Sequence, residues 1–190
     1  MSIIIAAKTD DRVVLMCDSA ETSAENVTIL TERERFKVLR LGDVLVGSAG
    51  SVKNIRCLVE HPEWFDTSGA PFDKKFIVTG IIPKLFKELA KYKILDTDDD
   101  NPKNQATVIM AYKNRLFCVD RNLSVYEADK FAAIGCTKLL IRPFLLDMKG
   151  GEEFDTMLRL MRLSGEMSPG VRPPYYCVDT ESFEYKRIEE

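Results

Sequence analysis

Two apolar runs joined by a short acidic turn open the chain and place the strongest constraint on its fold. Residues 3–8 (IIIAAK) and 12–18 (RVVLMCD) have the composition of β-strands, and the pair Asp10–Asp11 between them is typical of a hairpin turn. Most positions in both runs are apolar, instead of alternating between apolar and polar residues. A strand with this pattern has both of its faces covered. The opening hairpin is therefore expected inside a layered structure.

The remaining predicted elements come in groups of strands and groups of helices. Further strands are expected at 36–41, 44–48, 106–112, 115–120, 123–128, 131–135, 175–179 and 183–188. Helices are expected at 51–60, 73–92, 137–148 and 152–163, with Ser51 as an N-cap and a bend at Pro83. This grouping disfavours a doubly wound parallel sheet. The expected fold class is α+β, as a four-layer αββα sandwich of two antiparallel sheets in one domain over residues 1–190.

Composition and charge exclude several functional classes. The net charge of −3 on 190 residues gives no electrostatic basis for binding nucleic acid. No apolar stretch has the length of a membrane span, and the N-terminus lacks the pattern of a secretory signal. The five cysteines contain no CxxC pair and are an odd number, which indicates free thiols in a reducing compartment. We therefore expect a cytoplasmic protein without a nucleic-acid or membrane partner.

The residue after the initiator methionine offers a specific chemistry. If Met1 is removed, Ser2 carries a hydroxyl nucleophile and a free amine on the same residue. An α-amine has an unperturbed pKa of about 7.7–8.0, so it can be neutral near physiological pH and act as a base. The alternative is an ordinary translation start, in which Ser2 has no chemical role.

Motifs further along the chain strengthen the first interpretation. The pair Asp18–Ser19 begins sixteen residues after Ser2, and the segment RFKVLRLGDVLVGSAGS places Lys37 in one strand and Gly50 at the end of the next. In order and spacing these motifs, together with the strand group ATVIMAYKNRLFCVDRNLSVYEADKFAAIG, resemble the proteasome β-subunit group of N-terminal nucleophile (Ntn) hydrolases. That group includes bacterial ring proteases that pair with an unfoldase. The resemblance covers essentially the whole chain and implies the four-layer fold.

The resemblance also implies a catalytic site. Ser2 would attack a peptide carbonyl with its own amine as the base, in place of the threonine that is usual in the family. Lys37 would lower the pKa of that amine by like-charge repulsion, and Asp18 would hold Lys37 in position. The backbone N–H of Gly50 would stabilise the oxyanion. Taken singly, Asp18 could cap a turn, Lys37 could be a solvated charge, and Gly50 could serve only a tight turn.

Supporting residues follow from the same resemblance. Thr22 would line the substrate cleft, and Cys136 would replace the hydroxyl of a Gly-Ser-Gly turn. Ser168 would lie beside the amine, with Glu166 as a displaced substitute for an aspartate. No cofactor is implied. The one histidine, His61, is expected at the surface, and no metal site is expected because the acidic segment with Asp96, Asp98 and Asp100 lacks the Gly and Glu of a calcium loop.

Two functional classes remain open. The first is an N-terminal-serine peptidase that cleaves peptides or unfolded proteins inside a homo-oligomeric ring, with an ATPase unfoldase as a partner. The second is a catalytically silent, proteasome-like structural or assembly subunit. The state of the N-terminus separates them, because a retained Met1 leaves Ser2 without a free amine.

Overall fold

The computed structural model describes residues 1–23, 26–31, 36–92 and 105–189, which form helices and antiparallel sheets. One sheet consists of β1 (Ile3–Lys8), β2 (Val13–Cys17), β10 (Phe131–Gly135), β11 (Tyr175–Asp179) and β12 (Lys186–Ile188), in the order β10-β1-β2-β11-β12. The second sheet consists of β5 (Val38–Leu41), β6 (Val44–Gly50), β7 (Ala106–Tyr112), β8 (Arg115–Val119) and β9 (Val125–Glu127), in that order. The strand pairings of the described residues are antiparallel, so the α+β prediction is confirmed.

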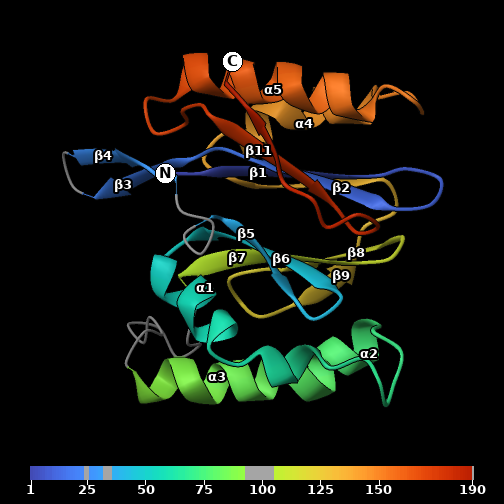
Figure 1. Ribbon diagram of the computed structural model, residues 1–190. Coiled ribbons are helices and arrows are strands. Elements are labelled where there is room, and N and C mark those ends of the chain that lie inside the picture. Colours follow the sequence, from blue (N-terminus) through green and yellow to red (C-terminus); the bar gives the residue numbers. More distant parts are fainter. Residues whose placement is uncertain (24–25, 32–35, 93–104, 190) are drawn as a thin grey trace.

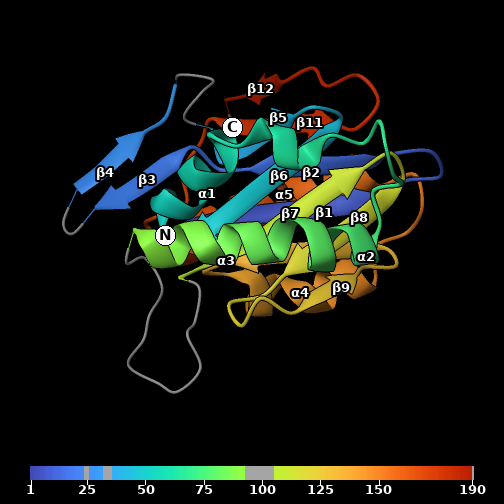
Figure 2. The same cartoon turned by 90° about the horizontal axis from the view of Figure 1, so that it is seen from below.

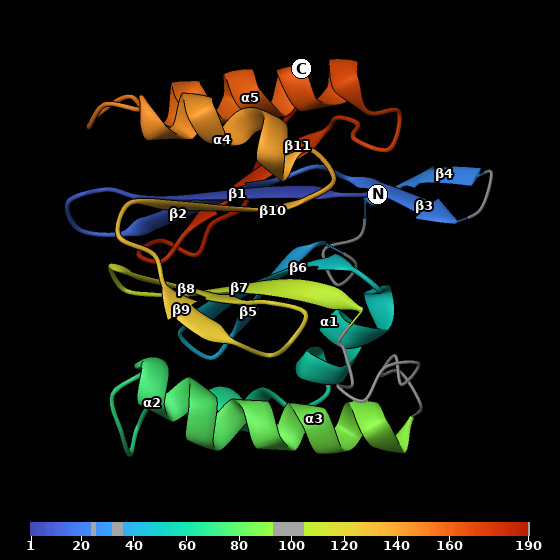
Figure 3. The ribbon, with the colours of Figure 1, turned by 180° about the vertical axis from the view of Figure 1, so that it is seen from behind.

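The helices lie on the outer sides of the two sheets. Beyond the first sheet lie α4 (Lys138–Leu146) and α5 (Glu153–Met167), and beyond the second lie α1 (Val52–Val59), the short helix η2 (Pro62–Phe65) and a continuous helical run, as Figures 1 and 3 show. That run is α2 (Lys74–Phe76), η3 (Ile77–Ile81) and α3 (Ile82–Lys91). Every described helix is too short or too polar to cross a bilayer.

Three separate apolar clusters fill the spaces between these layers. Ile3 and Ile5 of β1 pack toward α4 and α5, whereas Ile4 packs toward the second sheet. In the second sheet, Leu45 of β6 faces the first sheet and Val46 faces α1 and α3. Side chains of a strand point alternately to its two faces, and here both faces are buried. This is why the opening hairpin is apolar at consecutive positions, as predicted.

The helix predicted at 73–92 changes its winding near the middle. The Asp73 side chain accepts a hydrogen bond of 2.7 Å from the backbone N–H of Phe76 and caps its start. Residues 77–81 then form a π-helical turn, and Pro83 lies in the first turn of α3. A proline cannot donate to the carbonyl four residues earlier, so a local change of helix type accommodates Pro83 without ending the run.

Several details differ from the sequence-based prediction. An additional two-stranded pair, β3 (Ala20–Ser23) with β4 (Asn26–Ile29), projects from the body of the molecule (Figures 1 and 2). Ser51 occupies the N-cap position of α1, as predicted, but its side chain makes no capping hydrogen bond. The helix α5 extends four residues beyond the predicted end, to Met167. The acidic segment at 96–104 lies outside the described residues.

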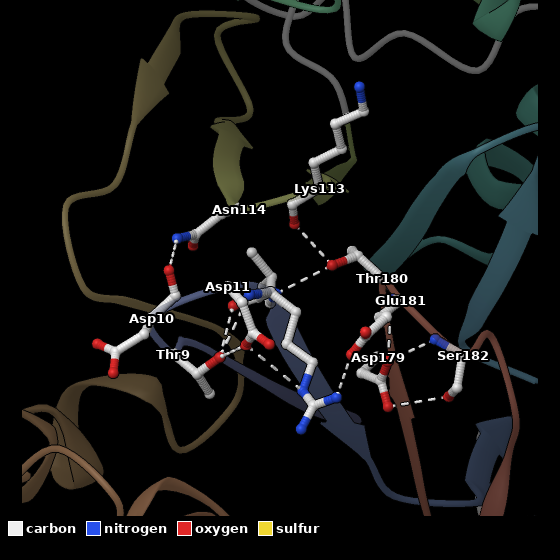
Figure 4. Close-up of polar contacts among 11 residues, drawn as sticks. Thr9, Asp10, Asp11, Lys113, Asn114, Asp179, Thr180, Glu181 and Ser182 are labelled. Atoms are coloured by element: carbon white, nitrogen blue, oxygen red, sulfur yellow. Dashed lines mark hydrogen bonds and ion pairs between the residues drawn. The ribbon is translucent and has the colours of Figure 1, made fainter.

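A polar network joins the two sheets at the end of the molecule away from the N-terminus (Figures 1 and 4). The Thr180 hydroxyl donates to the carbonyl oxygen of Lys113 at 2.6 Å and accepts from the backbone N–H of Val13 at 3.0 Å. The Asn114 amide donates to the carbonyl oxygen of Asp10 at 2.8 Å. The turns after β1 and β7 and the end of β11 are therefore tied to one another.

Candidate active site

The backbone on either side of Ser2 is held by two neighbouring segments. The N–H of Ile3 donates to Oδ1 of Asp18 at 2.9 Å, and the carbonyl oxygen of Ser2 accepts from the N–H of Cys136 at 2.9 Å. Gly135 has a φ of +118°, and a Cβ atom at this position would lie 1.9 Å from the Ser2 carbonyl oxygen. The close approach of β10 to Ser2 therefore requires glycine.

Asp18 and Lys37 form a buried ion pair beside this backbone. Lys37 Nζ lies 2.6 Å from Asp18 Oδ2, and the side chains of Lys37 and Asp18 are 8% and 0% exposed. Asp18 Oδ2 also accepts from the backbone N–H of Ala20 at 3.0 Å. Burial raises the pKa of Asp18, while the Lys37 ammonium and the backbone donors act in the opposite direction. One carboxylate thus fixes both the Lys37 ammonium and the chain immediately after Ser2.

Gly50 lies at the end of β6 in a backbone conformation that favours glycine. Its φ is +123°, and a Cβ atom there would lie 2.4 Å from the carbonyl oxygen of Gln105. The close approach of Gln105 and Ala106 therefore requires glycine at position 50. Gly50 and Ser2 line the same two cavities.

The three predicted supporting residues gather around Met1. The amino group of Met1 donates to the Thr22 hydroxyl. The Ser168 hydroxyl donates to the Met1 sulfur at 3.6 Å and accepts from the Cys136 thiol at 3.6 Å. Gly170 packs so closely that a Cβ there would lie 2.6 Å from the Cβ of Met1. With Met1 in place, the nitrogen of Ser2 is a peptide nitrogen and not an amine.

Two cavities meet at Ser2 and Gly50. The smaller, of about 60 Å³, is lined by apolar side chains and by a set of polar and charged ones: Glu21, Thr22, Lys37, Ser48, Ser51 and Arg56. The larger, of about 680 Å³, lies toward Cys136 and the start of α4 and is lined by Thr107, Asp120, Arg121, Asn122 and Lys138.

Solved structures with a similar fold cover almost the whole chain. The chain superimposes on Thiobacillus denitrificans BPH in complex with epoxomicin with a TM-score of 0.74 at 15% identity, covering 99% of this chain and 100% of that one. Anbu (ancestral beta-subunit) from Yersinia bercovieri gives 0.73 at 12% identity, and the helical assembly of the Anbu complex from Pseudomonas aeruginosa gives 0.74 at 14%. For both, the match covers 99% of this chain and 87% of the other. The chain has a proteasome-related fold. No protein-family model matches the sequence.

At these identities the comparisons establish the fold alone, and the roles of individual residues rest on the geometry. Asp18, Lys37, Gly50, Thr22, Cys136 and Ser168 all lie around the Met1–Ser2 segment. Glu166 is exposed near the end of α5. His61 is partly exposed, at 32% of its side-chain surface; its ring stacks on Trp64 with centroids 4.3 Å apart and its Nδ1 lies 3.0 Å from Glu63 Oε1.

Within the described parts of the chain, His, Cys, Asp and Glu side chains form no group of three that could hold a metal ion. Asp96, Asp98 and Asp100 lie outside the described residues. The five cysteines are free thiols, and four of them are buried, while Cys136 is exposed.

Ser48 is a site residue that the sequence did not single out. It lies on β6 two residues before Gly50, and the carbonyl oxygen of Lys37 accepts a hydrogen bond from its N–H at 3.1 Å. The Ser48 side chain lines the smaller cavity. The only available signal was its strand position relative to Gly50, because residues two apart on a strand share a face.

Proposed function

We propose that the chain is an N-terminal-serine peptidase of the proteasome-like type, with residues 1–190 forming one Ntn-hydrolase domain built as a four-layer αββα sandwich. The observation that carries the proposal is the buried pair of Lys37 and Asp18, whose carboxylate also binds the backbone next to Ser2. Burying a charge pair costs desolvation free energy. The fold does not need such a pair next to the chain terminus for its stability. A charged ammonium near an N-terminal amine is what an amine base with a lowered pKa requires.

The mechanism begins with removal of Met1. The Ser2 hydroxyl then attacks a peptide carbonyl carbon while its proton passes to the Ser2 amine. The backbone N–H of Gly50 stabilises the negative oxygen of the tetrahedral intermediate. The amine returns the proton to the departing nitrogen, which leaves an ester on Ser2. A water molecule, deprotonated by the same amine, attacks this ester and releases the acid product and Ser2.

Thr22, Cys136 and Ser168 hold supporting positions in this proposal. Thr22 binds the Met1 amino group in the present chain, so its hydroxyl is available to substrate once Met1 has left. Cys136 binds the Ser2 carbonyl through its N–H, and Ser168 is in hydrogen-bond contact with Cys136. These contacts orient Ser2 without taking part in bond breaking.

A catalytically silent structural subunit is the second candidate, and a specific observation favours it. Met1 is anchored at its amino group by Thr22, at its sulfur by Ser168 and along its side chain by Gly170. These three contacts favour retention of Met1. Retained Met1 would keep Ser2 acylated at nitrogen and unable to act as its own base.

We further propose that the chain works in the cytoplasm as a homo-oligomeric ring and acts on peptides or unfolded proteins delivered by an ATPase unfoldase. The oligomerisation in this proposal is supported by the Anbu complex of Pseudomonas aeruginosa, which forms a helical assembly. It is also supported by four large apolar side chains on the outer surface of α4: Leu139, Leu140, Phe144 and Leu146. Exposed apolar patches of this kind mark protein interfaces.

Intact-mass measurement combined with peptide hydrolysis tests the proposal. We expect the purified protein to lack Met1 and to cleave fluorogenic peptides, and Ser2→Ala to abolish cleavage while the fold is kept. Because BPH was solved with epoxomicin, we also expect epoxomicin to raise the melting temperature of the protein. Full retention of Met1 in an inactive protein would decide for the structural subunit.

A further inference from the structure

The turn that binds the Ser2 carbonyl is attached to α5 through two buried hydroxyl groups that the proposed mechanism does not use. The Thr137 hydroxyl donates to Oγ of Ser164 at 2.9 Å, and the two residues are 3% and 0% exposed. Thr137 directly follows Cys136, whose N–H donates to the Ser2 carbonyl oxygen. The contact between Thr137 and Ser164 therefore lies one residue away from the backbone group that holds Ser2.

The Thr137 hydroxyl is not used in the way that is usual for its position. Thr137 occupies the N-cap position of α4, but its side chain makes no capping hydrogen bond. An N-cap threonine ordinarily accepts a hydrogen bond from a backbone N–H in the first turn of its helix. At the start of α4, the N–H groups of Leu140 and Ile141 bond to the Thr137 carbonyl oxygen, at 3.0 and 3.2 Å. Because the Thr137 hydroxyl bonds to α5 instead, it fixes the turn relative to another helix.

A second contact joins the same turn to the next turn of α5. The N–H of Ser168 donates to the Ser164 carbonyl oxygen at 3.0 Å, so the two serines lie one helical turn apart. Ser164 binds Thr137, and Ser168 binds the Cys136 thiol. Two consecutive residues of the turn thus contact two consecutive turns of α5. One contact would allow the turn to pivot, whereas two contacts fix its orientation.

Burial makes the contact between Thr137 and Ser164 difficult to break. A hydroxyl in the protein interior cannot exchange its partner for water, so separation of the pair would leave both groups unsatisfied. Leu160 and Met161, which precede Ser164 on α5, belong to the apolar cluster between the first sheet and its helices. The turn is therefore anchored to a closely packed part of the fold.

We infer, on the basis of the peptidase function proposed above, that Thr137 and Ser164 are positioning residues for Ser2. They hold the Cys136 N–H against the Ser2 carbonyl oxygen, and this contact sets the direction in which the hydroxyl and the amine of Ser2 point. Neither Thr137 nor Ser164 is among the residues that line the two cavities at Ser2. Their loss should therefore slow the chemical step and leave substrate binding unchanged.

Hydrogen exchange of the Cys136 amide tests the positioning directly. With ¹⁵N-labelled cysteine, the strand residues Cys17 and Cys118 report general opening of the fold, and Cys136→Ala identifies the Cys136 signal by its loss. We expect Thr137→Val and Ser164→Ala each to raise the exchange rate of Cys136 about tenfold relative to Cys17 and Cys118. Thr137→Ser keeps the hydroxyl and should exchange like the parent protein.

The double variant Thr137→Val/Ser164→Ala separates position from stability. Each single variant leaves one buried hydroxyl without its partner, whereas the double variant removes both polar groups. We expect the double variant to melt at a higher temperature than Thr137→Val and yet to show the same rapid exchange at Cys136. A double variant that exchanges at the parent rate would overturn the inference.

Peptide hydrolysis provides a second readout. We expect kcat to fall about tenfold in Thr137→Val and Ser164→Ala with KM unchanged. Thr180→Val, which loses a buried hydroxyl bond at the opposite end of the molecule (Figure 4), should keep both constants. Cys136 exchange that stays at the parent rate or rises only in step with Cys17 and Cys118, or a change in KM alone, would overturn the inference. Faster Cys136 exchange in the variants of a parent protein that hydrolyses no peptide would leave the hold on Ser2 standing and reject the peptidase function.

Discussion

Asp18 shows how much of the candidate site depends on a single side chain. Its carboxylate binds Lys37, the N–H of Ile3 and the N–H of Ala20, so it connects β2, the chain before β5 and the N-terminus. Asp18 and Lys37 were identified from the sequence because the order and spacing of their motifs resemble those of the proteasome β-subunit group. The sequence could not reveal the contact of Asp18 with Ile3, because that contact depends on how closely two neighbouring strands approach.

Replacement of Asp18 by Asn should destabilise the protein strongly. The substitution keeps the shape but leaves the buried Lys37 ammonium without its counter-charge, and breaking a buried pair in this way costs about 3–5 kcal/mol. Urea unfolding followed by circular dichroism measures the loss. As a control, Asp18→Asn combined with Lys37→Met removes both charges and should cost less than Asp18→Asn alone. A double variant less stable than the single variant would contradict the pairing.

Gly135 should tolerate no side chain. Alanine there combines a φ of +118° with a Cβ 1.9 Å from the Ser2 carbonyl oxygen, so either β10 or the N-terminus must move. We expect Gly135→Ala to lower the free energy of unfolding by about 3 kcal/mol, from backbone strain and overpacking together. Gly150→Ala is the matched control, since a Cβ at Gly150 meets nothing within 4 Å. Equal melting temperatures for the two variants would show that Ser2 does not lie where the structure places it.

At the scale of elements, the sequence predicted strands correctly where their burial produces a strong pattern of apolar residues. The run at 3–8 was recognised because both faces of β1 are buried, and its bounds match the structure. The β3–β4 pair was missed because each strand has only four residues and β4 is exposed at all four positions, so no buried face marks it. The π-helical turn before Pro83 could not be foreseen in detail, because the proline predicts a disturbance of the helix but not its form.

The polar link between the two sheets provides a test at this scale. Thr180→Val keeps the shape of the side chain but loses the hydrogen bonds to Lys113 and Val13, and the Val13 N–H is left buried without a partner. We expect a loss of about 2 kcal/mol in the free energy of unfolding. Thr79→Val, whose exposed hydroxyl bonds only to the carbonyl of Lys75, should change stability by less than about 0.5 kcal/mol. Similar losses for both would argue against a link between the sheets through Thr180.

For the whole molecule, the continuous apolarity of the opening hairpin was enough to predict packing on both sides of a sheet. The structure has three apolar core clusters separated by the two sheets, so strands in the sheets bury apolar side chains on both faces. The smaller cavity was beyond prediction, because its lining comes from segments as distant as Glu21 and Arg56. Its depth and polarity arise only when α1 packs beside β6.

The prediction for assembly rests on the apolar side chains on the outer face of α4. Leu139 and Leu146 are 71% and 66% exposed, which is unfavourable in a monomer and favourable at a contact between copies. We expect Leu139→Glu/Leu146→Glu to convert the oligomer to smaller species in sedimentation velocity, because two charges would be buried at the contact. Val78→Glu/Phe86→Glu, on η3 and α3 at the opposite side of the molecule, is the control and should leave the oligomer intact. A monomeric parent protein would refute assembly altogether, and dissociation of the control alone would place the contact on the α3 side instead.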